Sequence, residues 1–253
     1  MDKPTVLLIH GMGNHTEASF LKQVKDTLTA SFQYYDCLKH KNIDDLMTFK
    51  VITYNHFFDD LRESMANNAS EIRTALGELG DMSESAINSA AEEILRMGAG
   101  ANEDDFFKEY FLDVLLYRYT VLGERIRLHV ADKIITEMRN HTRGAQGLHI
   151  IAHSLGTSVM HDTLTALYTD GLEGLSADPN ANKLNSLHMV ANVSRVLEND
   201  VNVSESIVKS GSQGCVTRFR MYEHTLDPFL FVKPFKPEND GSWIDEAYWQ
   251  LGY

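Results

Sequence analysis

The chain has 253 residues, of which 43% are hydrophobic and 23% charged, a composition typical of globular proteins and not of disordered or collagen-like ones. Its 36 acidic residues outnumber the 23 basic ones, and the net charge of −13 disfavours a nucleic-acid partner, which requires a basic surface. The two cysteines, Cys37 and Cys215, predict reduced thiols in a cytoplasmic protein. No apolar run reaches the roughly 18 residues of a membrane helix, so we expect no stable membrane anchor.

Short apolar runs alternate with helical patterns along the chain. The first run, residues 5–9, is rich in β-formers, and apolar residues recur at helical spacing over residues 17–32. A second helical pattern follows the run at residues 148–152 and continues to Leu167. This alternation predicts an α/β fold with a mostly parallel sheet of about six strands flanked by helices. The other predicted strands are residues 49–54, 187–193 and 216–222, with a weaker sixth at 229–232.

The interval between the second and third predicted strands is unusually long. Residues 57–105 contain twelve acidic and three basic residues, and an apolar helical pattern runs from Phe106 towards Arg139. We interpret residues 57–145 as a helical, lid-like insertion. No linker separates it from the rest, so we predict a single domain over residues 1–253.

Ser154 lies between a predicted strand and a predicted helix. A serine in this setting sits on a tight turn that exposes its hydroxyl. The turn brings neighbouring residues close together, and the positions two before and two after the serine are the small residues Ala152 and Gly156. The backbone N–H of Leu155, at the start of the helix, is placed to hold a developing negative charge. The pattern predicts a catalytic nucleophile, although small residues flank serines by chance in many chains.

A second motif, His10-Gly11-Met12-Gly13, follows the first predicted strand. Its glycines allow the backbone to bend so that the Met12 N–H points to the same place as the Leu155 N–H. Two such donors form an oxyanion hole, which stabilises the tetrahedral intermediate of acyl transfer. The alternative is a plain strand-to-helix turn that needs glycine for its geometry.

Together the two motifs resemble the α/β-hydrolase superfamily, particularly its lipase-like and serine-esterase-like branches. In those proteins an HG-x-G turn follows an early strand and a G-x-S-x-G turn follows a central one, and Ala152 replaces the first glycine here. The resemblance implies an α/β-hydrolase fold and no metal or organic cofactor. It also implies a catalytic acid after a late strand, which matches Asp227, although an Asp-Pro pair is also an ordinary start of a turn.

The general base is the point at which this chain departs from the superfamily. The catalytic histidine normally follows the acid, but no histidine follows Asp227. His224, three residues before the acid, is the histidine that we expect to act as the base. His188 and the insertion histidines His129 and His141 are alternatives.

These observations predict a serine hydrolase that acts on a small carboxylic ester, with lipid esters among its candidate substrates. Ser154, Asp227 and His224 would form an acyl-enzyme and hydrolyse it. The alternative is a degenerate hydrolase fold that serves as a binding or scaffolding module, which the missing C-terminal histidine favours. We expect no metal, because no group of histidine, cysteine or carboxylate residues has the spacing of a zinc site.

Overall fold

The computed structural model divides the chain into two compact units, of which the first contains the predicted site. This first unit comprises Met1–Thr53 and Arg127–Tyr253, and the second comprises Tyr54–Ile126. Most of the predicted insertion, residues 61–112, lies outside the part of the chain that the structure describes. The described residues are 3–13, 15–60, 113–114, 116–118, 121–194 and 206–223.

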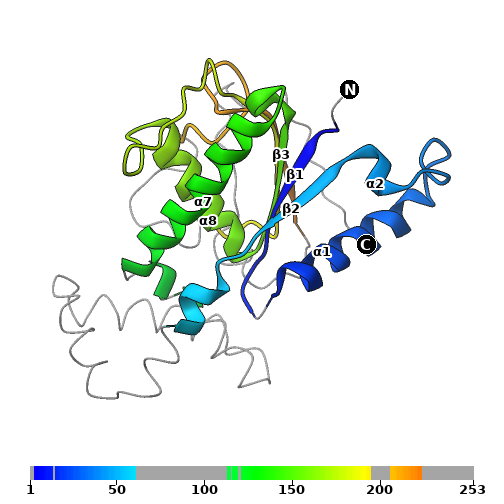
Figure 1. Cartoon of the computed structure of the whole chain (residues 1–253), viewed down its shortest axis with the longest axis horizontal. Coiled ribbons are helices and arrows are strands. Elements are labelled where there is room, and N and C mark those ends of the chain that lie inside the picture. Colours follow the sequence, from blue (N-terminus) through cyan, green and yellow to red (C-terminus); the bar gives the residue numbers. More distant parts are fainter. Residues whose placement is uncertain are drawn as a thin grey trace. The chain divides into compact units, whose positions relative to one another are not determined.

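The first unit is built on a sheet of five parallel strands in the order β2-β1-β3-β4-β5. Figure 1 labels β2, β1 and β3 of this sheet. The predicted α/β fold with a parallel sheet is therefore confirmed. The predicted sixth strand, residues 229–232, lies outside the described residues. The strands are β1 (Thr5–Ile9), β2 (Thr48–Ile52), β3 (Leu148–His153), β4 (Leu184–Val190) and β5 (Val216–Tyr222).

Helices cover the sheet on both faces. The first helix, α1, packs Phe20 against Val6 and Leu8 of β1 on one face. On the other face Lys50 of β2 forms an ion pair with Glu137 of α7. Figure 1 shows α1 on the opposite side of the sheet from α8. The described helices are α1 (Glu17–Phe32), α2 (Ile43–Leu46), α7 (Val121–Asn140), η1 (Gly144–Gly147) and α8 (Leu155–Tyr168).

Two helices of the first unit, α1 and α8, begin directly after a strand or its turn. Thr16 caps α1, because its side chain accepts a hydrogen bond from the Ser19 N–H at 3.1 Å. The helix α8 follows β3 with only Ser154 between them. Among the described residues, no helix is long and apolar enough to cross a membrane.

The strand order creates a switch in the direction of the chain at β1. From β1 the chain adds β2 on one side, and it later returns to add β3 on the other side. Loops that leave neighbouring strands in opposite directions open a crevice at the carboxyl edge of the sheet, where open α/β sheets commonly bind ligands. In this chain the two loops at that point are the ones that begin at His10 and Ser154.

Candidate functional site

Ser154 has a strained backbone conformation. Its φ of 50° and ψ of −126° lie in a region that L-amino acids rarely adopt. Such strain costs on the order of 1–3 kcal/mol and persists only where the surrounding structure holds it in place. The conformation is the one expected for a serine on a sharp turn between a strand and a helix.

The Ser154 hydroxyl does not cap the helix α8, which begins at the next residue. Ser154 occupies the N-cap position of α8, where a serine side chain usually accepts a hydrogen bond from a helical N–H. No such side-chain bond is present. Within the described part of the chain the hydroxyl makes no hydrogen bond, and the residue is half-buried. A capping role therefore does not explain this serine.

Gly11 lies directly beside Ser154. The register pairs Ile9 of β1 with Ala152 of β3, and continuing it by two residues places Gly11 level with Ser154. A Cβ atom on Gly11 would lie 2.8 Å from the Cβ of Ser154 and 3.0 Å from the Nδ1 of His153. The two motifs identified in the sequence therefore meet at the crevice between β1 and β3, and the glycine motif has no room for a side chain at Gly11.

Gly156 brings the start of α8 against the end of β1. A Cβ atom on Gly156 would lie 2.3 Å from the carbonyl oxygen of His10 and 2.8 Å from the Cγ2 of Ile9. A side chain at this position would therefore push the helix away from the strand. This contact explains why the residue two positions after the serine, Gly156, has to be small.

The His10 side chain orients the peptide that follows Gly11. Its Nδ1 lies 2.7 Å from the carbonyl oxygen of Gly11, which can only accept, so Nδ1 carries the proton. Because a peptide group is planar, fixing the Gly11 carbonyl also fixes the Met12 N–H on the opposite side. Burial lowers the pKa of His10 to about 4, with smaller contributions from His15 and His153. The imidazole is therefore uncharged at neutral pH.

Two backbone N–H groups beside Ser154 are available as donors. The Met12 and Leu155 N–H groups donate to no acceptor in the described part of the chain. Gly13, which ends the His10-Gly11-Met12-Gly13 motif, has a φ of 98°, and its carbonyl accepts a hydrogen bond from the His15 N–H at 3.0 Å. This positive φ explains the second glycine of the motif. The arrangement can offer hydrogen bonds to an oxyanion formed next to Ser154.

The predicted acid and base, Asp227 and His224, lie outside the described residues. The alternative base His188 lies within β4, where its Nε2 is 3.0 Å from the Ser186 hydroxyl and its Nδ1 is 3.1 Å from the Tyr222 hydroxyl. Burial, together with the charge of Arg220, lowers its pKa to about 4. Both ring nitrogens are engaged inside the sheet, so His188 is a structural residue and not a free base.

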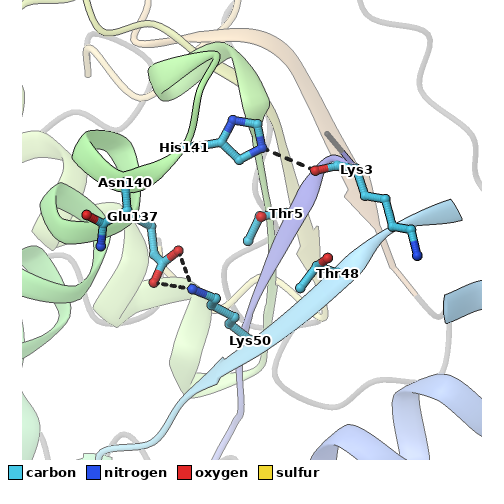
Figure 2. Close-up of a pocket in the computed structure, with 7 residues that line it drawn as sticks. All are labelled: Lys3, Thr5, Thr48, Lys50, Glu137, Asn140 and His141. Carbon is cyan, nitrogen blue, oxygen red and sulfur yellow. Dashed lines mark hydrogen bonds and ion pairs between the residues drawn. The ribbon is translucent and has the colours of Figure 1, made fainter. Parts of the chain in front are cut away.

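His141 lies at the opposite edge of the sheet from Ser154. It lines a hollow of about 480 Å³ beside Thr5 and Thr48, which begin β1 and β2 (Figure 2). Its Nε2 is 3.2 Å from the carbonyl oxygen of Lys3, and its Nδ1 accepts a hydrogen bond from a backbone N–H at 3.1 Å. Because the strands are parallel, their amino ends are a whole strand length away from Ser154, which excludes His141 as the base. The remaining alternative, His129, lies within α7.

The Lys50 side chain lines the same hollow, and its ammonium group is paired. It lies 2.7 Å from each carboxylate oxygen of Glu137, and Figure 2 shows the two side chains pointing toward each other. The pair largely neutralises its own charge. This ion pair contains no nucleophile with a base and oxyanion donors, which are the groups that we expect around Ser154.

Thr157 is a residue of the site that the sequence pattern did not single out. Its side chain is fully buried, and its hydroxyl donates to the Ser154 carbonyl oxygen at 2.6 Å. The same hydroxyl accepts a hydrogen bond from the Val193 N–H at 3.0 Å. A threonine in the first turn of a helix carries no signal of such a contact in the sequence.

Comparison with known proteins gives no match, either to a family model or to a curated protein or solved structure. Among the described residues, no group of three or more histidine, cysteine or carboxylate side chains is arranged to hold a metal ion. The functional argument therefore depends on the geometry around Ser154.

Proposed function

We propose that the protein is a serine hydrolase that acts on carboxylic esters through a covalent acyl-enzyme. The strained backbone of Ser154, with its hydroxyl free of any capping bond, is the observation that carries this proposal. The adjacent glycine turn at Gly11 supports it, because the absence of a side chain there allows this turn to approach Ser154 closely. The position at the switch point of the sheet agrees with where α/β proteins bind small molecules.

In the proposed reaction the Ser154 Oγ attacks the carbonyl carbon of the ester. A histidine takes the hydroxyl proton as the new C–O bond forms, and the Met12 and Leu155 N–H groups bind the resulting oxyanion. Collapse of the tetrahedral intermediate breaks the bond to the alcohol, which leaves with the proton from the histidine. Water then attacks the acyl-enzyme by the same route, releases the carboxylic acid and restores Ser154. No metal or organic cofactor enters these steps.

We assign the general base to His224 and the orienting acid to Asp227. His188 is engaged within β4 and His141 contacts the Lys3 carbonyl oxygen before β1, which supports a base contributed by the chain that follows β5. The acid would hold the imidazole in the tautomer that accepts the serine proton. Lipid esters are the candidate substrates that the resemblance to lipase-like hydrolases suggests.

The second candidate is a hydrolase fold that binds a partner without catalysis. The absence of a hydrogen-bond partner for the Ser154 hydroxyl among the described residues favours it. The strain at Ser154 argues against it, because a binding module gains nothing from keeping an unfavourable serine conformation. The two proposals differ in whether the hydroxyl reacts.

Hydrolysis of short activated esters, such as 4-nitrophenyl butyrate, separates the two candidates. We expect the wild-type protein to hydrolyse them at a rate that rises with pH through the histidine range near 6.5, and Ser154→Ala to fall to the background rate. Ser158→Ala is the matched control, because Ser158 is buried on the same helix and its hydroxyl has no partner within the described residues. Hydrolysis that survives in Ser154→Ala contradicts the assignment. A wild-type protein without esterase activity on these esters supports the binding module.

A further inference from the structure

The Thr157 hydroxyl joins two segments that are far apart in the chain. It donates to the Ser154 carbonyl oxygen at 2.6 Å and accepts from the Val193 N–H at 3.0 Å. A hydroxyl has one proton to donate, and here it goes to the Ser154 carbonyl oxygen. A lone pair of the Thr157 hydroxyl oxygen accepts the Val193 N–H. The side chain is fully buried, which protects both bonds from water. It therefore ties the serine turn to a segment 36 residues further along the chain.

The segment at the other end of this link is itself held in place. It begins at the end of β4, where the Val190 carbonyl oxygen accepts the Ser154 N–H at 2.9 Å. The next residue, Ala191, has a φ of 50°, and its N–H donates to the Tyr222 carbonyl oxygen of β5 at 2.9 Å. The turn after β4 is therefore fixed to the sheet and can serve as an anchor for Ser154.

The strain at Ser154 requires such an anchor. A residue in a sparsely populated backbone region relaxes unless its neighbours over-determine it. Here the N–H of Ser154 is held by Val190, and its carbonyl oxygen is held by both the Thr157 N–H, at 2.8 Å, and the Thr157 hydroxyl. Displacement of a nucleophile by about 1 Å lowers a rate by as much as 10²-fold.

We propose that Thr157 is a positioning residue for Ser154, whose hydroxyl holds the strained turn in its reactive geometry by linking it to Val193. This inference rests on the proposed function, since it assigns Thr157 a role in the same site. Thr157 acts through the backbone of Ser154 and does not touch the substrate.

Three variants on α8 test this role. Thr157→Val keeps the shape of the side chain and removes the hydroxyl, whereas Thr157→Ser keeps the hydroxyl. Thr163→Val is the matched control, because Thr163 is also fully buried on α8 and its hydroxyl has no partner in the described part of the chain. The same chemical change is therefore made on one helix with and without the link to Ser154.

The readout is the rate at which a fluorophosphonate labels Ser154, measured over a range of probe concentrations. We expect Thr157→Val to lower the maximal labelling rate by about 10- to 100-fold without changing the half-saturating concentration. Thr157→Ser should stay within about threefold of the wild type, because it restores both hydrogen bonds. Thr163→Val should label at the wild-type rate. A purely structural role would lower the amount of folded protein and leave the rate of the folded fraction unchanged.

Amide hydrogen exchange at Val193 reports on the link without any reaction. Its exchange should be faster in Thr157→Val and unchanged in Thr157→Ser and Thr163→Val, because only the first variant removes the acceptor. If Thr157→Val does not fold, Thr157→Cys takes its place, since a thiol is a weak donor and a weak acceptor. We expect that variant to label more slowly than Thr157→Ser.

Labelling of Thr157→Val at the wild-type rate overturns the proposal, as does labelling of Thr157→Ser that is as slow as that of Thr157→Val. Failure of the proposed function gives a different result. In that case the wild-type protein is not labelled at all while a control serine esterase reacts, and the positioning role fails together with the nucleophile.

Discussion

Gly156 and His10 are in such close contact that a single methyl group could not be placed between them. A Cβ on Gly156 would lie 2.3 Å from the His10 carbonyl oxygen. The contact joins the first turn of α8 to the end of β1, and so it brings the helix N-terminus next to the turn that carries Met12. Both predicted oxyanion donors depend on this closeness.

The first prediction concerns this contact. Gly156→Ala should lower the free energy of unfolding by about 2–3 kcal/mol, since overpacking a rigid site typically costs 1–3 kcal/mol and the neighbouring atoms are backbone. Gly174→Ala is the control, because a Cβ there would meet no atom within 4 Å and only the φ of 82° opposes it. Urea unfolding measures both. Equal losses in the two variants would show that α8 can move away from β1 without strain.

The second prediction concerns strain at the serine. Ser154→Gly should be more stable than Ser154→Ala by about 1 kcal/mol, because glycine adopts a positive φ readily and alanine does not. At Ser158, inside α8, Ser158→Ala should be more stable than Ser158→Gly by about 1 kcal/mol, since glycine is the poorer helix former. Thermal and urea unfolding of the four variants give the comparison. If alanine is the more stable residue at both positions, Ser154 is not strained.

The third prediction concerns acid stability. In the folded protein burial lowers the pKa values of His10 and His188 to about 4, whereas in the unfolded chain both titrate near 6.5. The unfolded state therefore takes up protons first as the pH falls below 6.5. The free energy of unfolding is fully retained above that value and should decrease between pH 6.5 and 4, by about 3 kcal/mol for His10 alone.

A matched pair of variants tests this pH dependence. His188→Gln should flatten the decrease in stability between pH 6.5 and 4, because it removes one of the two buried imidazoles. His40→Gln, at an exposed position, controls for the loss of a histidine as such. Urea unfolding at a series of pH values measures the slope. A slope that is the same in His188→Gln and in the wild type would contradict a buried, uncharged imidazole at this position.

The fourth prediction separates the histidines by role. His188→Gln should lose about 1–2 kcal/mol of stability through its contacts with Ser186 and Tyr222, yet keep ester hydrolysis within about threefold of the wild type. His224→Ala should abolish hydrolysis in a folded protein. Loss of hydrolysis in folded His188→Gln, with activity retained in His224→Ala, would reverse the assignment of the base.

Local sequence patterns predicted much of the sheet and its helices. The helix at residues 17–32 and the strand at residues 216–222 have the predicted bounds. In the helix, apolar residues recur at helical spacing along its whole length. β4 begins at Leu184, three residues before the predicted start, since Asn185 and Ser186 place polar side chains in the first part of the strand. A search for apolar runs does not detect such a segment.

The strand β2 ends earlier than its sequence suggests. Its pattern extends to Tyr54, but the ladder with β1 ends at the pair Ile9–Ile52, where β1 turns into its glycine motif. The bounds of a strand thus depend on its partner, which is not visible in the strand's own residues.

The sharp turn at Ser154 and its close contacts with glycine residues were predictable from the sequence, whereas the residues that hold the turn in place were not. Ser154, Gly11 and Gly156 have local signals, because a sharp turn demands small neighbours. The role of Thr157 depends on the Val193 N–H, which is 36 residues away, and no spacing rule connects the two. The same reason applies to the general base, since a histidine is brought to a serine by loop geometry and not by periodicity.

The most direct test of the proposed function is the mass of the protein after reaction with a fluorophosphonate, followed by peptide mapping. We predict one adduct per chain, located on Ser154, formed by the wild-type protein and by Ser158→Ala and absent from Ser154→Ala. No adduct on the wild-type protein, or an adduct at another residue, while a control serine esterase is fully labelled, would contradict the assignment of Ser154 as an activated nucleophile.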